Sequence, residues 1–245
     1  MKISLRTLLT LALRAIKWFI ILTVLWVLLY RFVPVPVTYL MVKRCVQQWW
    51  QGREVRLEKK WVPLQKISNE MQLAVVCAED QRFLWHNGFD WDAMADALKY
   101  NRGQQSKSRK KVRGASTISQ QTAKNVFLFP ARNIFRKILE AYFTVLIELL
   151  WSKERILEVY LNVIEFGDGV YGVEAASQRY FKKPAAKLNS KEAARLAAVL
   201  PAPLRYSVDK PGAYVLRRQD HILHQMSLWG GRFDFSIKPT ERKSL

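Results

Sequence analysis

Residues 76–90 read VCAEDQRFLWHNGFD. An apolar run, QLAVVCA at residues 72–78, leads directly into two adjacent acids, Glu79 and Asp80. Ser68 is a suitable N-cap, so we expect a helix from Ser68 to about Asp80 with its apolar side chains in the core. Acids at the end of such a helix are either surface caps or reactive carboxylates at the edge of a cleft. The local pattern leaves both interpretations open.

The chain of 245 residues is strongly basic. It has 40 Lys and Arg against 20 Asp and Glu, a formal net charge of +20 at pH 7. This surplus favours anionic partners such as nucleic acid, lipid headgroups or phosphorylated substrates. The two cysteines, Cys45 and Cys77, are too few for a disulfide framework or a zinc site. The sequence also has no CxxC, HExxH, P-loop or GxGxxG motif.

The N-terminal region contains an apolar segment, WFIILTVLWVLLY, at residues 18–30. These residues span about 20 Å as a helix, so flanking apolar residues must extend them across a hydrocarbon core of ~30 Å. A cleaved signal peptide is the alternative, but no small-residue cleavage site follows the run. We predict an uncleaved single-span anchor. The expected organisation is a cytoplasmic N-terminus and transmembrane helix at 1–33, a membrane-proximal junction at 34–62 and one domain at 63–245.

The junction mixes aromatic and basic side chains between residues 38 and 62, including Trp49 and Trp50. Such a mix suits a segment that lies on a lipid surface. A neck packed on the domain is an equally good interpretation. Basic residues flank both ends of the apolar segment, so the positive-inside rule indicates only weakly that the domain lies outside the cytoplasm.

Most of the remaining sequence has helical periodicity. Helices are expected at residues 116–127, 132–151 and 212–229. Ser152 is a suitable N-cap for KERILEVYLNVIEF, and Asn189 with Glu192 forms a capping-box pattern before KEAARLAAVL. No alternating strand pattern exceeds four residues. The sequence therefore predicts one mostly α domain.

The expected helix at 116–127 has a polar face. Thr117, Gln121 and Lys124 fall at i, i+4 and i+7, and Asn125 borders them. The N–H groups at a helix start also suit a phosphate. A solvated surface face is the simpler interpretation, and the spacing alone favours it.

The following helix brings Arg136, Lys137 and Glu140 onto one face. An intrahelical ion pair explains this pattern without any function. Alternatively, Glu140 is a second carboxylate held ionised beside two cations that could also bind a diphosphate. With Glu79 and the anchor, these parts fit chemistry on a sugar attached to a lipid phosphate, one carboxylate acting as base and cations holding the leaving diphosphate.

Four segments carry a resemblance to a known family. They are EDQRFLWHNGFD at 79–90, RGASTISQQTAKN at 113–125, RKILE at 136–140 and KERILEVYLN at 153–162. In this order and spacing they resemble the peptidoglycan glycosyltransferases of family 51, which polymerise lipid II. The likeness runs from about residue 64 to about 227. The resemblance implies a lysozyme-like, two-lobed helical glycosyltransferase domain, and the single anchor and domain resemble the monofunctional members of Gram-negative bacteria.

The resemblance also implies roles for individual residues. Glu79 falls on the family's general base and Glu140 on its second carboxylate, while Asp80 supports the setting of Glu79. The expected substrate-binding set is Asp80, Thr117, Gln121, Lys124, Asn125, Arg136 and Lys137, with Lys124 as phosphate ligand. No organic cofactor is expected, no metal site is assigned, and a divalent cation, Mg²⁺ or Mn²⁺, is left open.

The family reaction inverts the sugar in a single displacement, without a covalent glycosyl-enzyme. We expect the carboxyls of Glu79 and Glu140 to lie at least as far apart as in inverting glycosidases, ~6.5–9.5 Å. A cationic cleft would lower the pKa of Glu79 and burial would raise it. The sequence leaves that balance open.

The resemblance places the protein in the bacterial inner membrane with its domain in the periplasm. Expected partners are lipid II, the nascent glycan strand, membrane lipid and other cell-wall synthesis or division proteins, but no nucleic acid. The basic stretch at 101–114 is interpreted as a flap that touches anionic headgroups or the lipid II diphosphate. A peptidoglycan-cleaving enzyme of the same fold and a non-catalytic membrane scaffold are the competing interpretations.

Overall fold

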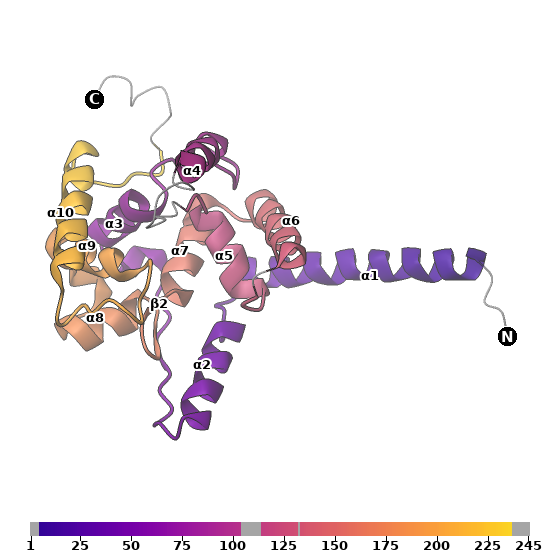
Figure 1. The fold of residues 1–245 in the computed structure, drawn as a ribbon, viewed down its shortest axis with the longest axis horizontal. Helices are drawn as coiled ribbons and strands as arrows, with labels where there is room; N and C mark the ends of the chain where they lie inside the picture. The colour runs from indigo at the N-terminus through magenta and orange to yellow at the C-terminus, as the bar shows by residue number, and fades with distance from the viewer. Residues whose placement is uncertain (1–4, 104–113, 132, 237–245) are drawn as a thin grey trace.

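The computed structural model describes residues 5–103, 114–131 and 133–236 (Figure 1). Its α-helices are α1 (Leu5–Phe32), α2 (Tyr39–Trp50), α3 (Asn69–Glu79), α4 (Trp91–Gly103), α5 (Ile118–Phe127), α6 (Ile134–Leu150), α7 (Lys153–Val163), α8 (Val173–Phe181), α9 (Ser190–Val199) and α10 (Ala213–Leu228). Three short strands are β1 (Glu58–Lys59), β2 (Glu165–Gly167) and β3 (Val170–Tyr171). The mostly α fold class with one N-terminal apolar helix is confirmed. A lysozyme-like, two-lobed division stays a prediction.

Helix α1 projects from the domain as a single long rod (Figure 1). Its apolar part, Arg6–Phe32, is 27 residues long, roughly 40 Å at the helical rise and enough to cross a membrane. The C-terminal half of α1 is docked on the domain. The Trp151 indole donates a hydrogen bond of 2.9 Å to the Val27 carbonyl, and the Thr23 and Tyr142 hydroxyls lie 2.7 Å apart. The C-terminal half of α1 therefore packs against α6 and its C-cap residue Trp151.

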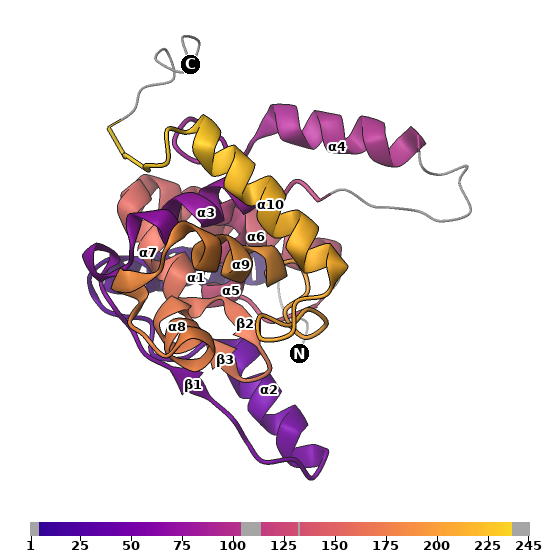
Figure 2. The same ribbon diagram turned by 90° about the vertical axis from the view of Figure 1, so that its left-hand side faces the viewer.

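The helices of the domain follow from their capping signals. Ser68 caps α3, Ser152 caps α7, and Asn189 forms a capping box with Glu192 at α9, each as predicted. Helix α3 packs against both α9 and α10, whereas α5 packs on α6 and α7 (Figure 2). Seven consecutive residues of α3, from Met71 to Cys77, are buried. The helix that ends in the two acids is thus a core helix.

A three-stranded sheet was not predicted from the sequence. Its strand order is β1-β3-β2, with β1 parallel and β2 antiparallel to β3. Gly169, between β2 and β3, has φ +74°, and a Cβ there would lie 2.5 Å from the Arg56 carbonyl oxygen. The sheet joins residues 58–59 to the domain, so the predicted junction at 34–62 is partly built into it.

Helix α2 turns away from the line of α1 (Figure 1). Its side chains form two distinct faces. One face buries Met41 and Gln48, and Arg44 Nε lies 3.2 Å from Glu165 Oε1. The other face exposes a stripe of large apolar side chains, namely Tyr39, Val42, Val46, Trp49 and Trp50. The packed face confirms the interpretation of this segment as a neck on the domain. Lipid contact by the exposed stripe stays a prediction.

Candidate active site

Glu79 lies where the buried part of α3 ends. It is the last residue of the helix, and its side chain is 14% exposed. Gln121 Nε2 of α5 donates a hydrogen bond of 3.0 Å to Glu79 Oε2, and Arg218 Nη2 of α10 lies 3.4 Å from Glu79 Oε1. Tyr160 of α7 donates to Gln121 Oε1 at 3.3 Å. Four helices therefore position one carboxylate.

The environment of Glu79 settles the balance that the sequence left open. Burial is the largest influence and raises the pKa of Glu79 above its ordinary value. The hydrogen bond from Gln121 and the charges of Arg218 and Lys124 act in the opposite direction but are outweighed. A carboxylate with a raised pKa is a stronger base, which suits a group that must accept a proton.

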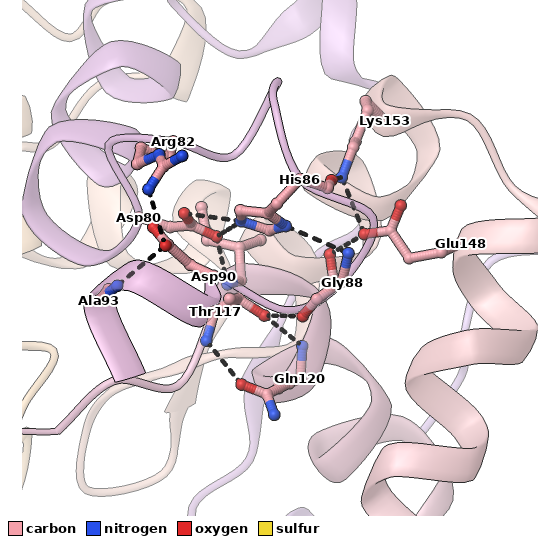
Figure 3. A network of polar contacts seen from close by, with 12 residues as sticks. Asp80, Arg82, His86, Gly88, Asp90, Ala93, Thr117, Gln120, Glu148 and Lys153 are labelled. Atoms are coloured by element: carbon pink, nitrogen blue, oxygen red, sulfur yellow. Dashed lines mark hydrogen bonds and ion pairs between the residues drawn. The ribbon is translucent and has the colours of Figure 1, made fainter. Parts of the chain in front are cut away.

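Asp80, the next residue, is buried and makes its polar contacts with other parts of the chain (Figure 3). Its carboxylate accepts a hydrogen bond of 3.0 Å from the backbone N–H of Ile118 and lies 3.0 Å from His86 Nε2. His86 Nδ1 accepts from the N–H of Gly88, so the ring proton is on Nε2 and points to Asp80. Asp80 therefore ties the end of α3 to the start of α5.

Thr117 is also part of this supporting network. Helix α5 begins at Ile118 and Thr117 is its buried N-cap, outside the helical face on which spacing had placed it. Its hydroxyl donates to the Gly88 carbonyl at 2.7 Å and accepts from the N–H of Gln120 at 3.1 Å. The contacts of Asp80 and Thr117 are thus within the protein, and substrate contact by either residue stays a prediction.

The second predicted carboxylate, Glu140, is only 2% exposed. Arg136 Nη1 donates to it at 2.7 Å, and Lys137 forms an ion pair with its other oxygen. Burying an ion is costly unless it is paired, so the two cations account for a charged group at this position. The intrahelical ion pairs suggested by the sequence are present, with Glu140 and Arg136 largely buried and Lys137 half exposed.

Lys124 is within the electrostatic influence of both Glu79 and Glu140. Burial lowers the pKa of Lys124, and the charges of Glu140 and Glu79 oppose this shift. Lys124, Asn125 and Arg136 line a cavity of about 450 Å³. The Nε atom of Arg136 is buried without a hydrogen-bond partner among the described residues. The cavity therefore has a cationic lining from Lys124 and Arg136.

Comparison with known proteins identifies the family. The transglycosylase family profile matches residues 46–227. The chain belongs to the transglycosylase family. Its match begins earlier than the resemblance at about residue 64 indicated, and so includes part of α2.

Individual relatives agree with this assignment and cover most of the chain. Proteins named biosynthetic peptidoglycan transglycosylase are 56% identical over 214 residues in Bdellovibrio bacteriovorus and 51% identical over 219 residues in Pasteurella multocida. These matches cover 87% and 89% of this chain, and 84% and 87% of the relatives. A Pseudomonas putida relative of the same name is 49% identical over 231 residues, 94% of this chain and 95% of its own. The predicted resemblance is confirmed.

The structure of this transglycosylase adds two residues to the predicted site, Arg218 and Tyr160. Arg218 lies on the last helix, 139 positions from Glu79, and no local pattern marks it. Tyr160 lies within the KERILEVYLN segment, which pointed to the family but not to this side chain. The predicted basic flap falls largely on residues 104–113, which lie outside the described part of the chain.

The described part of the chain offers few ligands for the Mg²⁺ or Mn²⁺ ion that the sequence left open. Within residues 5–103, 114–131 and 133–236, no group of three or more His, Cys, Asp or Glu side chains gathers. Glu79 and Glu140 each already face cations. At phosphate sites a Mg²⁺ ion takes most of its ligands from substrate oxygens and water. The described protein side chains fit a metal ion bound in that way and not one held by protein ligands alone.

Proposed function

We propose that this protein polymerises lipid II into glycan strands and releases the lipid diphosphate at each step. The chain is a peptidoglycan glycosyltransferase of cell-wall synthesis, as its family and its relatives indicate. The lipid-linked donor is supported above all by one observation. A buried carboxylate, Glu79, is held at the end of a core helix within the electrostatic influence of Lys124, which lines a cavity together with Arg136.

Glu79 acts as the general base. It takes the proton from the 4-hydroxyl of the acceptor N-acetylglucosamine as that oxygen attacks C1 of the donor sugar. Gln121 and Arg218 hold the carboxylate in position from two sides. The bond from C1 to the diphosphate oxygen breaks as the new bond forms, so the α-linked donor becomes a β-linked product in a single displacement.

The cations of α5 and α6 neutralise the leaving diphosphate. Lys124 and Arg136 line the cavity, and Lys137 lies beside Glu140. Glu140 orients Arg136 and Lys137 through its two oxygens. Charge stabilisation of this kind is usually a large part of catalysis, because it acts where charge develops. A divalent cation that enters with the substrate would add positive charge for the same purpose.

Helix α1 anchors the enzyme in the bacterial inner membrane by a single span, with the domain in the periplasm, where lipid II presents its sugars. The apolar length of α1 and its docking on the domain support this arrangement. Nascent glycan, membrane lipid and other cell-wall synthesis or division proteins are the partners that follow from it.

The test is polymerisation of lipid II by the purified full chain. Wild type should form polymer, and Glu79→Gln and Lys124→Ala should each lose about 10²-fold or more in rate. Glu70→Gln, in the first turn of the same helix, is the matched control and should remain active. Undiminished polymer from Glu79→Gln would exclude the mechanism, and cleavage of finished peptidoglycan without polymerisation would favour a lytic enzyme.

A further inference from the structure

The cavity lined by Lys124 and Arg136 is also lined by residues that do not belong to the predicted site. Leu40 and Lys43 of α2 line it together with residues of α5 and α6. Helix α2 packs against α5 and is separated from α1 by residues 33–38 alone. The cavity is therefore completed by the helix that directly follows the membrane anchor.

Lys43 has no apparent structural role. It is half-buried, and no hydrogen bond or ion pair joins it to the part of the chain that the structure describes. The adjacent Arg44 differs, because it binds Glu165 and attaches α2 to the domain. None of the described residues that line the cavity is acidic. The charge of Lys43 thus stands uncompensated at this wall.

The other lining groups indicate what kind of ligand fits. Lys124 and Arg136 add two cations, and the buried Nε of Arg136 is an unsatisfied donor. Buried donors of this kind normally have a partner, and an anionic oxygen is the strongest one available to a guanidinium. Leu40, Leu128 and Pro130 give the same cavity an apolar part. The matching ligand has a multiply charged anionic group joined directly to hydrocarbon.

We propose that α2 completes the binding site for a prenyl diphosphate, with Lys43 on the diphosphate and Leu40 against the first prenyl units. This inference rests on the proposed function and adds to it a contact from the membrane-proximal helix. Lys43 would bind the diphosphate equally before and after the sugar bond breaks. Uniform binding of this kind affects KM more than kcat, so Lys43 is a substrate-positioning residue.

Binding of undecaprenyl diphosphate in detergent to the full chain tests the proposal. Lys43→Ala should weaken binding about tenfold, as expected for loss of a charge-assisted contact, whereas Lys43→Arg should retain most of it. Lys66→Ala removes an exposed lysine outside the cavity and should bind as wild type does. With undecaprenol, which lacks the diphosphate, Lys43→Ala should equal wild type, while Leu40→Ser should weaken both ligands.

Kinetics with lipid II and binding to phosphatidylglycerol vesicles distinguish failure of this proposal from failure of the proposed function. With lipid II, Lys43→Ala should raise KM about tenfold and leave kcat nearly unchanged. Unchanged binding and unchanged KM would overturn the proposal, and so would an equal loss of binding to phosphatidylglycerol vesicles, which would indicate a general anionic-lipid contact. A further outcome is that wild type forms no polymer from lipid II while Lys43→Ala still weakens the binding of undecaprenyl diphosphate. In that case the proposed function would fail and the prenyl diphosphate site would stand.

Discussion

The carboxylate of Asp80 accepts a hydrogen bond of 3.0 Å from the backbone N–H of Ile118. The residue that follows the proposed base therefore fixes the first turn of the helix that carries Gln121 and Lys124. His86 holds the same carboxylate from the other side (Figure 3). The relative position of the base and its partners on α5 thus depends on a buried acid that need not touch substrate.

Replacing Asp80 by Ala should therefore destabilise the fold as well as the site. The change leaves the Ile118 N–H and the His86 Nε2–H without their acceptor, at an expected cost of about 2–3 kcal/mol in the free energy of unfolding. Chemical unfolding of the detergent-solubilised protein measures it. Asp92→Ala is the control, because Asp92 is 78% exposed and its salt bridge with Arg82 lies at the surface. Equal stability of the two variants would contradict this role for Asp80.

The rate of polymerisation should have a bell-shaped dependence on pH. Glu79 must be ionised to accept a proton, so kcat/KM should rise as pH increases through a pKa that burial has raised above the ordinary value. Lys124 must be protonated to bind phosphate, so kcat/KM should fall again as pH passes through its lowered pKa. In Lys124→Arg the alkaline limb should move to higher pH, because arginine stays charged. A profile of kcat/KM against pH for both proteins checks this.

Arg218 should influence the reaction through Glu79. Its charge lowers the pKa of Glu79 against the effect of burial, so Arg218→Gln should raise that pKa and shift the acid limb of kcat/KM to higher pH. Near neutral pH we expect a loss of about tenfold, which should shrink as pH rises. Arg217→Gln changes the exposed neighbour on α10 and serves as the matched control. A loss independent of pH would mean that Arg218 acts in some other way.

Local signals predicted the helices because a cap acts within a few residues of itself. Ser68, Ser152 and the pair Asn189–Glu192 mark helix starts that the structure reproduces. The sheet has strands of two or three residues, too short for a pattern of alternation. Its parallel pairing joins residues 58–59 to 170–171, and only the tertiary fold brings them together.

The same distinction applies to the site. Gln121 and Lys124 could be placed on one face because both lie within a helix, and both influence Glu79 in the structure. Helix α5 starts at Ile118, two residues after the predicted start at 116, so Thr117 is its N-cap rather than a residue of its first turn. Arg218 and Lys43 reach the site from distant helices, and helical spacing carries no information about such approaches. The pKa of Glu79 likewise depends on burial, which is a property of the whole fold.

The exposed stripe of α2 should lie in the membrane interface. Trp49 and Trp50 are 69% and 81% exposed, and tryptophan at such a position favours the boundary between headgroups and hydrocarbon. In nanodiscs of brominated lipid, full-length protein with Trp49→Phe and Trp50→Phe should therefore lose a clear part of its tryptophan quenching. Trp91→Phe, at an equally exposed tryptophan on α4, should change it little. Unchanged quenching in the Trp49 and Trp50 variant would mean that the stripe does not face lipid, and that α2 acts only as a neck and a cavity wall.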